Sequence, residues 1–221
     1  MNTSYAIGDL HGCSKTFRKL VTKGIRLEKT DELYCLGDYV DRGPDSKGVI
    51  DYIFELREQG FKVHTLRGNH DQMMMDAQKN SESFKDWLRN GGNTTLQSFN
   101  VESYDQLDSK YKRFFYETQF HIETGNYILV HAGLNFRNDN LFEDTHAMMW
   151  IRGYSVDEKK LAGRIIVPGH TPIPWEIIRT QNGQQIIDID GGCVYTQLTG
   201  FGHLVALNLT TRDFIAVENC E

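Results

Sequence analysis

The chain has 221 residues, with 30 acidic and 24 basic side chains and a formal net charge of −6. This length allows one domain with a full core, so we expect residues 1–221 to form a single domain. The acidic balance argues against a general nucleic-acid binder, and every apolar run is shorter than the ~20 residues that a membrane helix needs. We therefore expect neither nucleic acid nor a membrane among its partners.

The thiols and the first residues predict where the protein works. Residues 1–4 lack the basic and apolar regions of a signal peptide, and the four cysteines show no paired spacing. These cysteines are Cys13, Cys35, Cys193 and Cys220. We expect four reduced thiols in a cytoplasmic protein.

The first seventy residues alternate short apolar runs with helical patterns. We expect strands at 4–7, 32–36 and 62–66, and helices at 14–23 and 46–59 that are each followed by a glycine. Strand–helix–strand units of this length imply parallel pairing with right-handed crossovers. Residues 71–118 read as helical, with methionine, tryptophan, leucine and phenylalanine side chains for their core.

The last hundred residues change character and read as mostly antiparallel strands. Strands are expected at 120–123, 127–130, 164–167, 175–180, 185–189, 203–209 and 214–218. Thr124-Gly125 and Asn182-Gly183 are hairpin signals. An α/β half followed by an antiparallel half predicts an α/β (α+β) fold, a two-sheet β-sandwich flanked by α-helices.

Five short polar motifs each follow one of these apolar runs. They read Gly8-Asp9-Leu10-His11-Gly12, Gly37-Asp38-Tyr39-Val40-Asp41-Arg42-Gly43, Gly68-Asn69-His70-Asp71, Val130-His131-Ala132-Gly133 and Pro168-Gly169-His170-Thr171-Pro172. Function in open α/β sheets lies at the carboxyl ends of strands, where these motifs would sit. One such motif is weak, but several in order indicate a metal site.

The polar side chains of these motifs form a candidate ligand set: Asp9, His11, Asp38, Asn69, His131 and His170. Imidazoles with carboxylates suit Mn, Fe, Zn or Co rather than Ca. Six ligands around a central carboxylate fit two metal ions roughly 3.5–4 Å apart, with Asp38 as the bridge. The remaining histidines are expected to be packing or surface residues: His64, His121, His146 and His203.

Together the five motifs resemble the calcineurin-like metallophosphoesterases, and within them the phosphoprotein phosphatase group, bacterial and phage serine/threonine phosphatase type. The pattern there is GDxHG, GDxVDRG, GNH[ED], HAG and GH, and it runs here from Gly8 to His170. Trp150-Ile151-Arg152 and residues 189–195 look like that group as well. These last pieces also resemble the symmetrical diadenosine tetraphosphate hydrolases.

The resemblance implies a role for each motif residue. The first metal would be held by Asp9, His11 and Asp38, and the second by Asp38, Asn69, His131 and His170. The residues expected to act in catalysis are His70, as general acid to the leaving group, and Asp41, which would orient it. The phosphate-binding residues would be Arg42, Arg152 and Asn69.

The chain departs from the family pattern at two places. Asp71 stands where glutamate is commoner, at a position beside the chemistry. Asp190-Gly191-Gly192-Cys193 stands where relatives have threonine before a single glycine, which weakens any inference about substrate from that loop.

These motifs lead to a functional hypothesis. We expect a dinuclear-metal phosphomonoesterase that hydrolyses phosphoserine and phosphothreonine, and small phosphate esters, by direct attack of metal-bound hydroxide. Manganese is the favoured metal, with iron, zinc or cobalt as alternatives, and the partner would be a phosphorylated protein or a small ester. The nearest alternative is hydrolysis of diadenosine tetraphosphate. A nuclease and a non-catalytic binding module remain further alternatives.

Other phosphate chemistries fit the sequence poorly. A cysteine-dependent phosphatase needs arginine six positions after the cysteine, but six after Cys35 is Asp41. The chain has no Gly-x-x-x-x-Gly-Lys-Ser/Thr loop, so a P-loop NTPase is excluded. Asp188-x-Asp190 faintly resembles an aspartyl-phosphate motif but lies at the wrong end of the chain.

Overall fold

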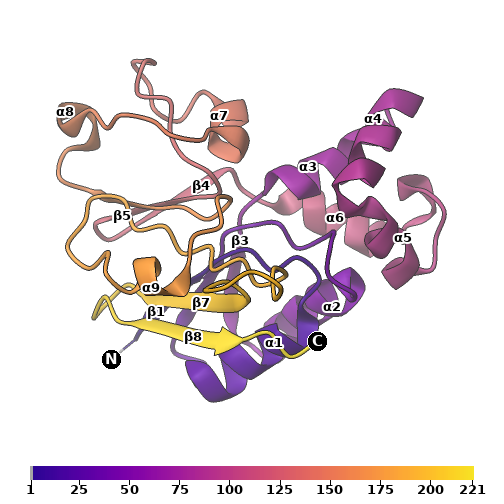
Figure 1. Ribbon diagram of the computed structural model, residues 1–221, viewed down its shortest axis with the longest axis horizontal. Helices are drawn as coiled ribbons and strands as arrows, with labels where there is room; N and C mark the ends of the chain where they lie inside the picture. Colours follow the sequence, from indigo (N-terminus) through magenta and orange to yellow (C-terminus); the bar gives the residue numbers. More distant parts are fainter. Residues whose placement is uncertain (1) are drawn as a thin grey trace.

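Two β-sheets packed face to face carry the fold, in a computed structural model that describes residues 2–221 (Figure 1). The larger sheet has the strand order β3-β2-β1-β7-β8, in which β1, β2 and β3 are parallel and β7 and β8 antiparallel. Its strands are β1 Ser4–Ile7, β2 Glu32–Cys35, β3 Lys62–Thr65, β7 His203–Asn208 and β8 Phe214–Glu218. The smaller sheet has the order β4-β5-β6, with strands His121–Thr124, Tyr127–Val130 and Ile165–Val167.

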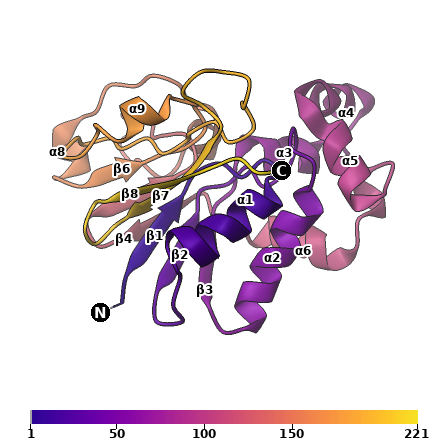
Figure 2. The same ribbon diagram turned by 60° about the horizontal axis from the view of Figure 1, so that its bottom comes forward.

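Helices cover the outer faces of the sandwich. Figure 2 shows α1 and α2 lying along the larger sheet, and α3 to α6 form the helical middle of the chain. The helices are α1 Ser14–Lys19, α2 Ser46–Glu58, α3 Asn69–Asp76, α4 Ser81–Trp87, α5 Asn93–Phe99, α6 Ser109–Glu117, α7 Thr145–Trp150, α8 Glu158–Leu161 and α9 Trp175–Ile178. The predicted fold class and the predicted helical middle are confirmed.

The alternation of side chains along each strand divides the core into layers. In β1, Ala6 faces the space between the sheets and Ile7 faces the helices. In β5, Leu129 faces the space between the sheets and Ile128 faces the α7 and α8 side. Strands β5 and β6 are buried throughout, whereas the edge strands β4 and β8 are only partly buried.

Two strand predictions were wrong. Within residues 175–180, Trp175–Ile178 form the short helix α9, in which the N–H of Ile178 donates to the carbonyl oxygen of Pro174 at 3.1 Å. Tryptophan and isoleucine favour strands, but Pro174 at the N-cap and the 53% exposure of Ile177 fit a surface turn of helix.

Residues 185–189 run extended beside β6 but make only an isolated bridge, between Ile186 and Ile166. The side chains of Ile187 and Ile189 are buried between the sheets, which explains the apolar pattern that predicted a strand.

The structure also describes the helix lengths and the cysteines. No helix among residues 2–221 is long and apolar enough to cross a bilayer. The four cysteines are unpaired in this part of the chain, and Cys13 is fully buried at the N-cap of α1.

Candidate metal centre

Five loops converge at one end of the sandwich and carry the predicted ligands. They leave the carboxyl ends of β1, β2, β3, β5 and β6 (Figures 1 and 2). Because β1 to β3 are parallel, their three loops meet at one sheet edge, and the facing sheet adds the other two. All six candidate ligands are at most 5% exposed.

Asp38 lies at the centre of the cluster. Two buried groups have ligand atoms within 4.8 Å of one another, His11 with Asp38 and His70, and Asp9 with Asp38 and His131. Both groups contain Asp38, which fits two cations that share one carboxylate. The first group also includes His70, which the sequence resemblance does not count as a ligand.

The environment of His131 fits a bound cation. Its Nδ1 donates to the carbonyl oxygen of Leu36 at 3.0 Å, which leaves Nε2 bare in the neutral ring. That nitrogen faces Asn69 Oδ1 at 3.0 Å and Asp38 Oδ1 at 3.6 Å, so three acceptor atoms point at one another. Burial, and then the nearby His170, hold the pKa of His131 well below its usual range, so protonation does not relieve this contact. A metal ion would satisfy all three atoms.

His11 presents a nitrogen to the cluster in the same way. Its Nδ1 donates to the carbonyl oxygen of Val40 at 2.8 Å, and its Nε2 lies 3.4 Å from Asp38 Oδ2. Arg42 Nη1 donates to the same Nε2 at 2.5 Å. A metal ligated by His11 would therefore displace this arginine and release its guanidinium.

His170 and Asp9 close the other side of the cluster. The backbone N–H of His170 donates to Asp9 Oδ1 at 3.1 Å, and His170 Nδ1 lies 2.8 Å from Asn69 Oδ1. The Nε2 atom of His170 is buried without a hydrogen-bond partner among the described residues. Burial, with the guanidinium of Arg152, lowers the pKa of His170 to about 4, so this imidazole is neutral at pH 7.

The carboxylates of the cluster are electrostatically frustrated without a cation. Burial, followed by the charge of Asp190, raises the pKa of Asp9 well above its usual range. Burial and the charge of Asp71 do the same for the pKa of Asp38. Divalent cations would remove this penalty, because buried charges need a paired charge or a metal.

The backbone at the site is held in uncommon conformations. His11, Asp38, Asp41, Arg42 and His170 all have positive φ, at 39°, 49°, 70°, 69° and 69°. Such residues cost of order 1–3 kcal/mol each and persist where surrounding contacts enforce them. Their concentration in three of the five motifs marks this region as the functional site.

His70 and Asp41 form a buried pair beside the ligand cluster. His70 Nδ1 donates to Asp41 Oδ2 at 2.8 Å, and both side chains are at most 3% exposed. Asp41 also accepts from Trp87 Nε1 at 2.9 Å and from Thr95 Oγ1 at 2.7 Å. Burial lowers the pKa of His70, and the hydrogen bond and charge of Asp41 oppose that change.

Sequence reasoning missed the supporting residues of this pair. Trp87 was expected in the helix core and in the stretch Trp87-Leu88-Arg89-Asn90-Gly91-Gly92, which resembles the bacterial serine/threonine phosphatase type, but without a role at the site; Thr95 carried no expectation. Trp87 lies 46 positions and Thr95 54 positions from Asp41 in the sequence, so no short motif contains either residue together with Asp41.

Asp71 has a larger structural role than its position beside the chemistry suggested. Its carboxylate accepts from the backbone N–H of Asp38 and of Gly68, both at 2.9 Å, and of Tyr39 at 3.0 Å. It therefore fixes the loop that presents Asp38. Gly37 in this loop has φ +115°, and a Cβ there would lie 2.5 Å from the nitrogen of Gly68.

The two predicted phosphate-binding arginines lie at the site. Arg152 is exposed, and its Nη1 donates to Thr171 Oγ1 at 2.9 Å, next to His170. The guanidinium of Arg42 stands over the Tyr195 ring, 5.7 Å from its centroid. Tyr195 belongs to the loop that begins with the divergent Asp190 motif.

The other four histidines lie outside the cluster. His64 stacks on Tyr34, His121 on Phe142, His146 on Trp150 and His203 on Trp175.

A two-sheet sandwich that gathers histidine and carboxylate side chains from five strand-end loops defines the class of metal-dependent phosphoesterases. Residues 3–197 match the family model described as Calcineurin-like phosphoesterase, and the chain belongs to this family. The family predicted from the motifs is thereby confirmed.

Two curated relatives are similar to the chain. Serine/threonine-protein phosphatase 1 of Salmonella typhimurium is 28% identical over 200 residues, which is 86% of this chain and 87% of that protein. The symmetrical bis(5'-nucleosyl)-tetraphosphatase of Nitrosospira multiformis is 36% identical over 133 residues, 59% of this chain. This second match spans only 43% of the length of that relative.

A solved structure supports the fold. A protein serine/threonine phosphatase from Saccharomyces cerevisiae superposes with a TM-score of 0.67 at 17% identity, over 100% of this chain and 81% of that one. At this identity the likeness speaks for the fold alone.

Proposed function

We propose that this single-domain chain is a dinuclear-metal phosphomonoesterase. The observation that carries the proposal is the central position of Asp38 between two buried groups of ligand-type side chains. One ion would be held by Asp9, His11 and Asp38. The other would be held by Asp38 together with Asn69, His131 and His170. Bound there, the ions would lower the pKa of a water and neutralise charge on the phosphoryl group.

The residues of the chain supply the remaining chemistry. In hydrolysis the bond between phosphorus and the ester oxygen breaks, a bond to the water oxygen forms, and the departing alkoxide needs a proton. We assign that proton to His70, whose Nδ1 is held by Asp41 at 2.8 Å, which leaves Nε2 for the leaving group. Asp41 acts through His70 and is a positioning residue. Positioned acid catalysis of this kind contributes about 10²–10⁴-fold.

The arginines bind the phosphoryl oxygens in this proposal. Arg42 would leave His11 Nε2 when a metal takes that position, and the freed guanidinium would turn to the substrate. Arg152 is exposed beside His170 and offers a second planar set of donors. Asn69 contributes an amide at the same place.

Manganese is the proposed metal, with iron, zinc or cobalt as alternatives. The donor set mixes neutral imidazole nitrogens with carboxylate and amide oxygens, which suits these ions. We also propose a cytoplasmic location, which the four unpaired thiols support.

The proposed substrates are phosphoserine and phosphothreonine in proteins, together with small phosphate esters. The similarity to serine/threonine-protein phosphatase 1 over 86% of the chain supports this choice. Manganese-loaded protein should release phosphate from a phosphoserine peptide, and no phosphorylated protein should be trapped after acid quenching. A covalent phosphoenzyme would refute direct hydrolysis.

The second candidate is symmetrical hydrolysis of diadenosine tetraphosphate. It is favoured by the 36% identity over 133 residues to the tetraphosphatase of Nitrosospira multiformis. Side-by-side kinetics decide between the two, because a preference for the dinucleotide by orders of magnitude in kcat/KM would replace our first choice.

A further inference from the structure

The guanidinium of Arg42 has two close neighbours at the metal centre. Its Nη1 donates to His11 Nε2 at 2.5 Å, and its Cζ stands 5.7 Å from the centroid of the Tyr195 ring. Arg42 makes no ion pair within residues 2–221. If a metal takes His11 Nε2, the Tyr195 ring is therefore the contact that remains.

The base of the Arg42 side chain is held in place. Its backbone has φ 69°, and its N–H donates to the carbonyl oxygen of Gly91 at 3.4 Å. A Cβ at Gly91 would lie 2.9 Å from the Arg42 nitrogen and 3.1 Å from its Cγ, so the two segments are in close contact. Release from His11 therefore frees only the outer end of this side chain.

The Tyr195 ring is placed by a tight turn. The N–H of Tyr195 donates to the carbonyl oxygen of Gly192 at 2.8 Å. Gly192 has φ +59°, and a Cβ there would lie 2.8 Å from Phe201 Cδ1 and 3.0 Å from Tyr195 Cδ2. Since a side chain at this position would push the ring aside, the glycine is part of what places it.

The loop that carries this turn is anchored at its start. The carbonyl oxygen of Asp190 accepts from the N–H of Ile173 at 3.0 Å, and that of Gly191 accepts from the N–H of His203 at 3.2 Å. A Cβ at Gly191 would lie 2.5 Å from the His203 carbonyl oxygen. Gly191 belongs to the motif in which the chain departs from the family pattern, and here it lets the loop lie against β7.

Asp190 attracts Arg42 without a direct contact. Burial raises the pKa of Asp190 to about 6, and the N–H of Gly192 and the charge of Arg42 oppose that rise. The carboxylate accepts from Gly192 at 2.9 Å and makes no ion pair within the described residues. The ring of Tyr195 thus gives the guanidinium a directed contact that Asp190 does not.

We propose that Tyr195 is a positioning residue for Arg42. Its ring face attracts the guanidinium and keeps it beside the phosphoryl oxygens once a metal has taken His11 Nε2. This inference rests on the proposed phosphoester hydrolysis, in which Arg42 binds the phosphoryl group. Tyr195 acts through Arg42 and needs no contact with the substrate.

The test measures binding of inorganic phosphate to manganese-loaded protein by calorimetric titration. Tyr195→Leu keeps apolar bulk but removes the ring, so phosphate should bind about fivefold more weakly. Tyr195→Phe keeps the ring and should bind phosphate as the wild type does. An unchanged affinity in Tyr195→Leu, or an equal loss in Tyr195→Phe, overturns the role of the ring.

A double-mutant cycle separates positioning from a general effect on the loop. Tyr195→Leu should weaken phosphate binding when Arg42 is present and leave it unchanged in the Arg42→Ala background. Equal weakening in both backgrounds overturns the proposal, because the ring would then act without Arg42.

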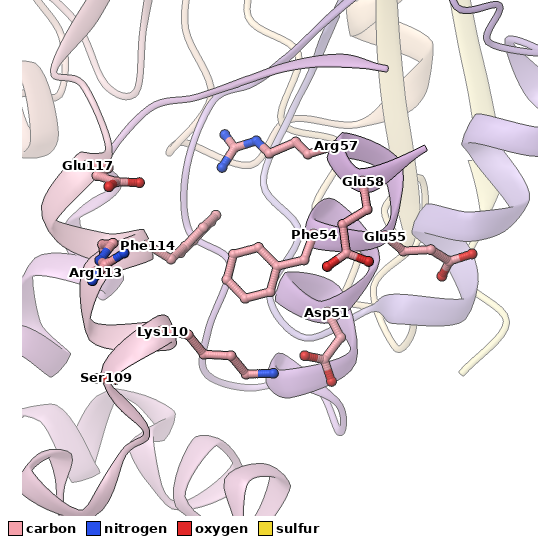
Figure 3. A pocket seen from close by; sticks show the side chains of 10 residues that line it. All are labelled: Asp51, Phe54, Glu55, Arg57, Glu58, Ser109, Lys110, Arg113, Phe114 and Glu117. Carbon is pink, nitrogen blue, oxygen red and sulfur yellow. The ribbon is translucent and has the colours of Figure 1, made fainter. Parts of the chain in front are cut away.

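The matched control is a cation over an aromatic ring away from the metal centre. Lys110 Nζ lies 5.8 Å from the centroid of the Phe54 ring, in the cavity between α2 and α6 (Figure 3). None of the six candidate ligands is among the described lining residues of that cavity. Phe54→Leu should therefore keep the wild-type affinity for phosphate.

Failure of this inference is distinguishable from failure of the proposed function. If manganese-loaded wild-type protein hydrolyses neither a phosphoserine peptide nor diadenosine tetraphosphate, the proposed hydrolysis fails. Phosphate binding that still depends on Tyr195 through Arg42 then supports the positioning role. A wild-type protein that binds manganese but no phosphate overturns the positioning role, because Arg42 then holds no phosphoryl group.

Discussion

The Asp41→Asn substitution tests whether His70 acts as the proton donor. Asp41 is fully buried and accepts hydrogen bonds from His70, Trp87 and Thr95. Asparagine keeps the shape but removes the charge, and its NH₂ group then faces at least one of these donors. Losing one hydrogen bond to a charged group costs roughly 1.5–3 kcal/mol. If that loss falls on the transition state, turnover slows about 10- to 100-fold.

The assay compares leaving groups. The leaving group of a phosphoserine peptide is a serine alkoxide, which needs a proton to depart. The leaving group of p-nitrophenyl phosphate is p-nitrophenolate, which needs little protonation. Asp41→Asn should slow the first substrate by the full factor and the second much less. Because Asp41 opposes the lowering of the His70 pKa, the alkaline fall in activity should also move to lower pH.

Asp45→Asn is the matched control. Asp45 caps α2 by accepting from Gly48 at 2.9 Å, and its contacts do not include His70. This variant should lower stability without any dependence on the leaving group. Equal slowing of both substrates by Asp41→Asn, with an unmoved pH profile, would refute the role of His70.

Further predictions concern the metal ligands. The Gly169→Ala substitution places a Cβ 2.4 Å from Asp9 Oδ1, so it should displace Asp9 and lower the metal content measured by elemental analysis. The control is Gly125→Asn, at a position with φ +54° and no atom within 4 Å of an added Cβ, and this variant should keep the wild-type metal content. Burial raises the pKa of Asp190 to about 6 and of Asp71 to about 7, so these groups stabilise the metal-free fold when protonated. That stability is present below the ordinary carboxyl pKa and is lost as pH rises through about 6 to 7. The lowered pKa values of the buried His131 and His170 have the opposite effect on stability below pH 6.5, the ordinary histidine value, so the melting temperature of metal-free protein should fall between pH 6.5 and pH 8. Added Mn²⁺ should raise it at pH 8 by binding the folded state alone; a metal-free melting temperature that rises over this pH range would contradict the assignment of buried, protonated carboxyls.

Local patterns were enough to predict most of the fold and the residues gathered at the site. Each motif, such as that of Asp38, directly follows its strand in the sequence. Because β1, β2 and β3 are parallel, the motifs that follow them must meet at one edge of the sheet. The misread segment 175–180 shows the limit, because a four-residue helix after Pro174 has too few residues to display a period.

Contacts distant in sequence account for what was missed. Trp87 and Thr95, in the helical middle of the chain, donate hydrogen bonds to Asp41. The apolar pattern of that region predicts a packing role and gives no sign of these hydrogen bonds. Asp71 was noticed for its departure from glutamate, but its three backbone hydrogen bonds appear only in three dimensions.

The metal content of the Asp38→Asn variant tests the two-metal centre most directly. Asp38 is the residue common to both ligand groups, so its carboxylate should be needed for a shared site. Elemental analysis of manganese-loaded wild-type protein should give two ions per chain, and Asp38→Asn should retain at most one. A wild-type protein that binds one ion, or an Asp38→Asn variant that still binds two, would contradict the account.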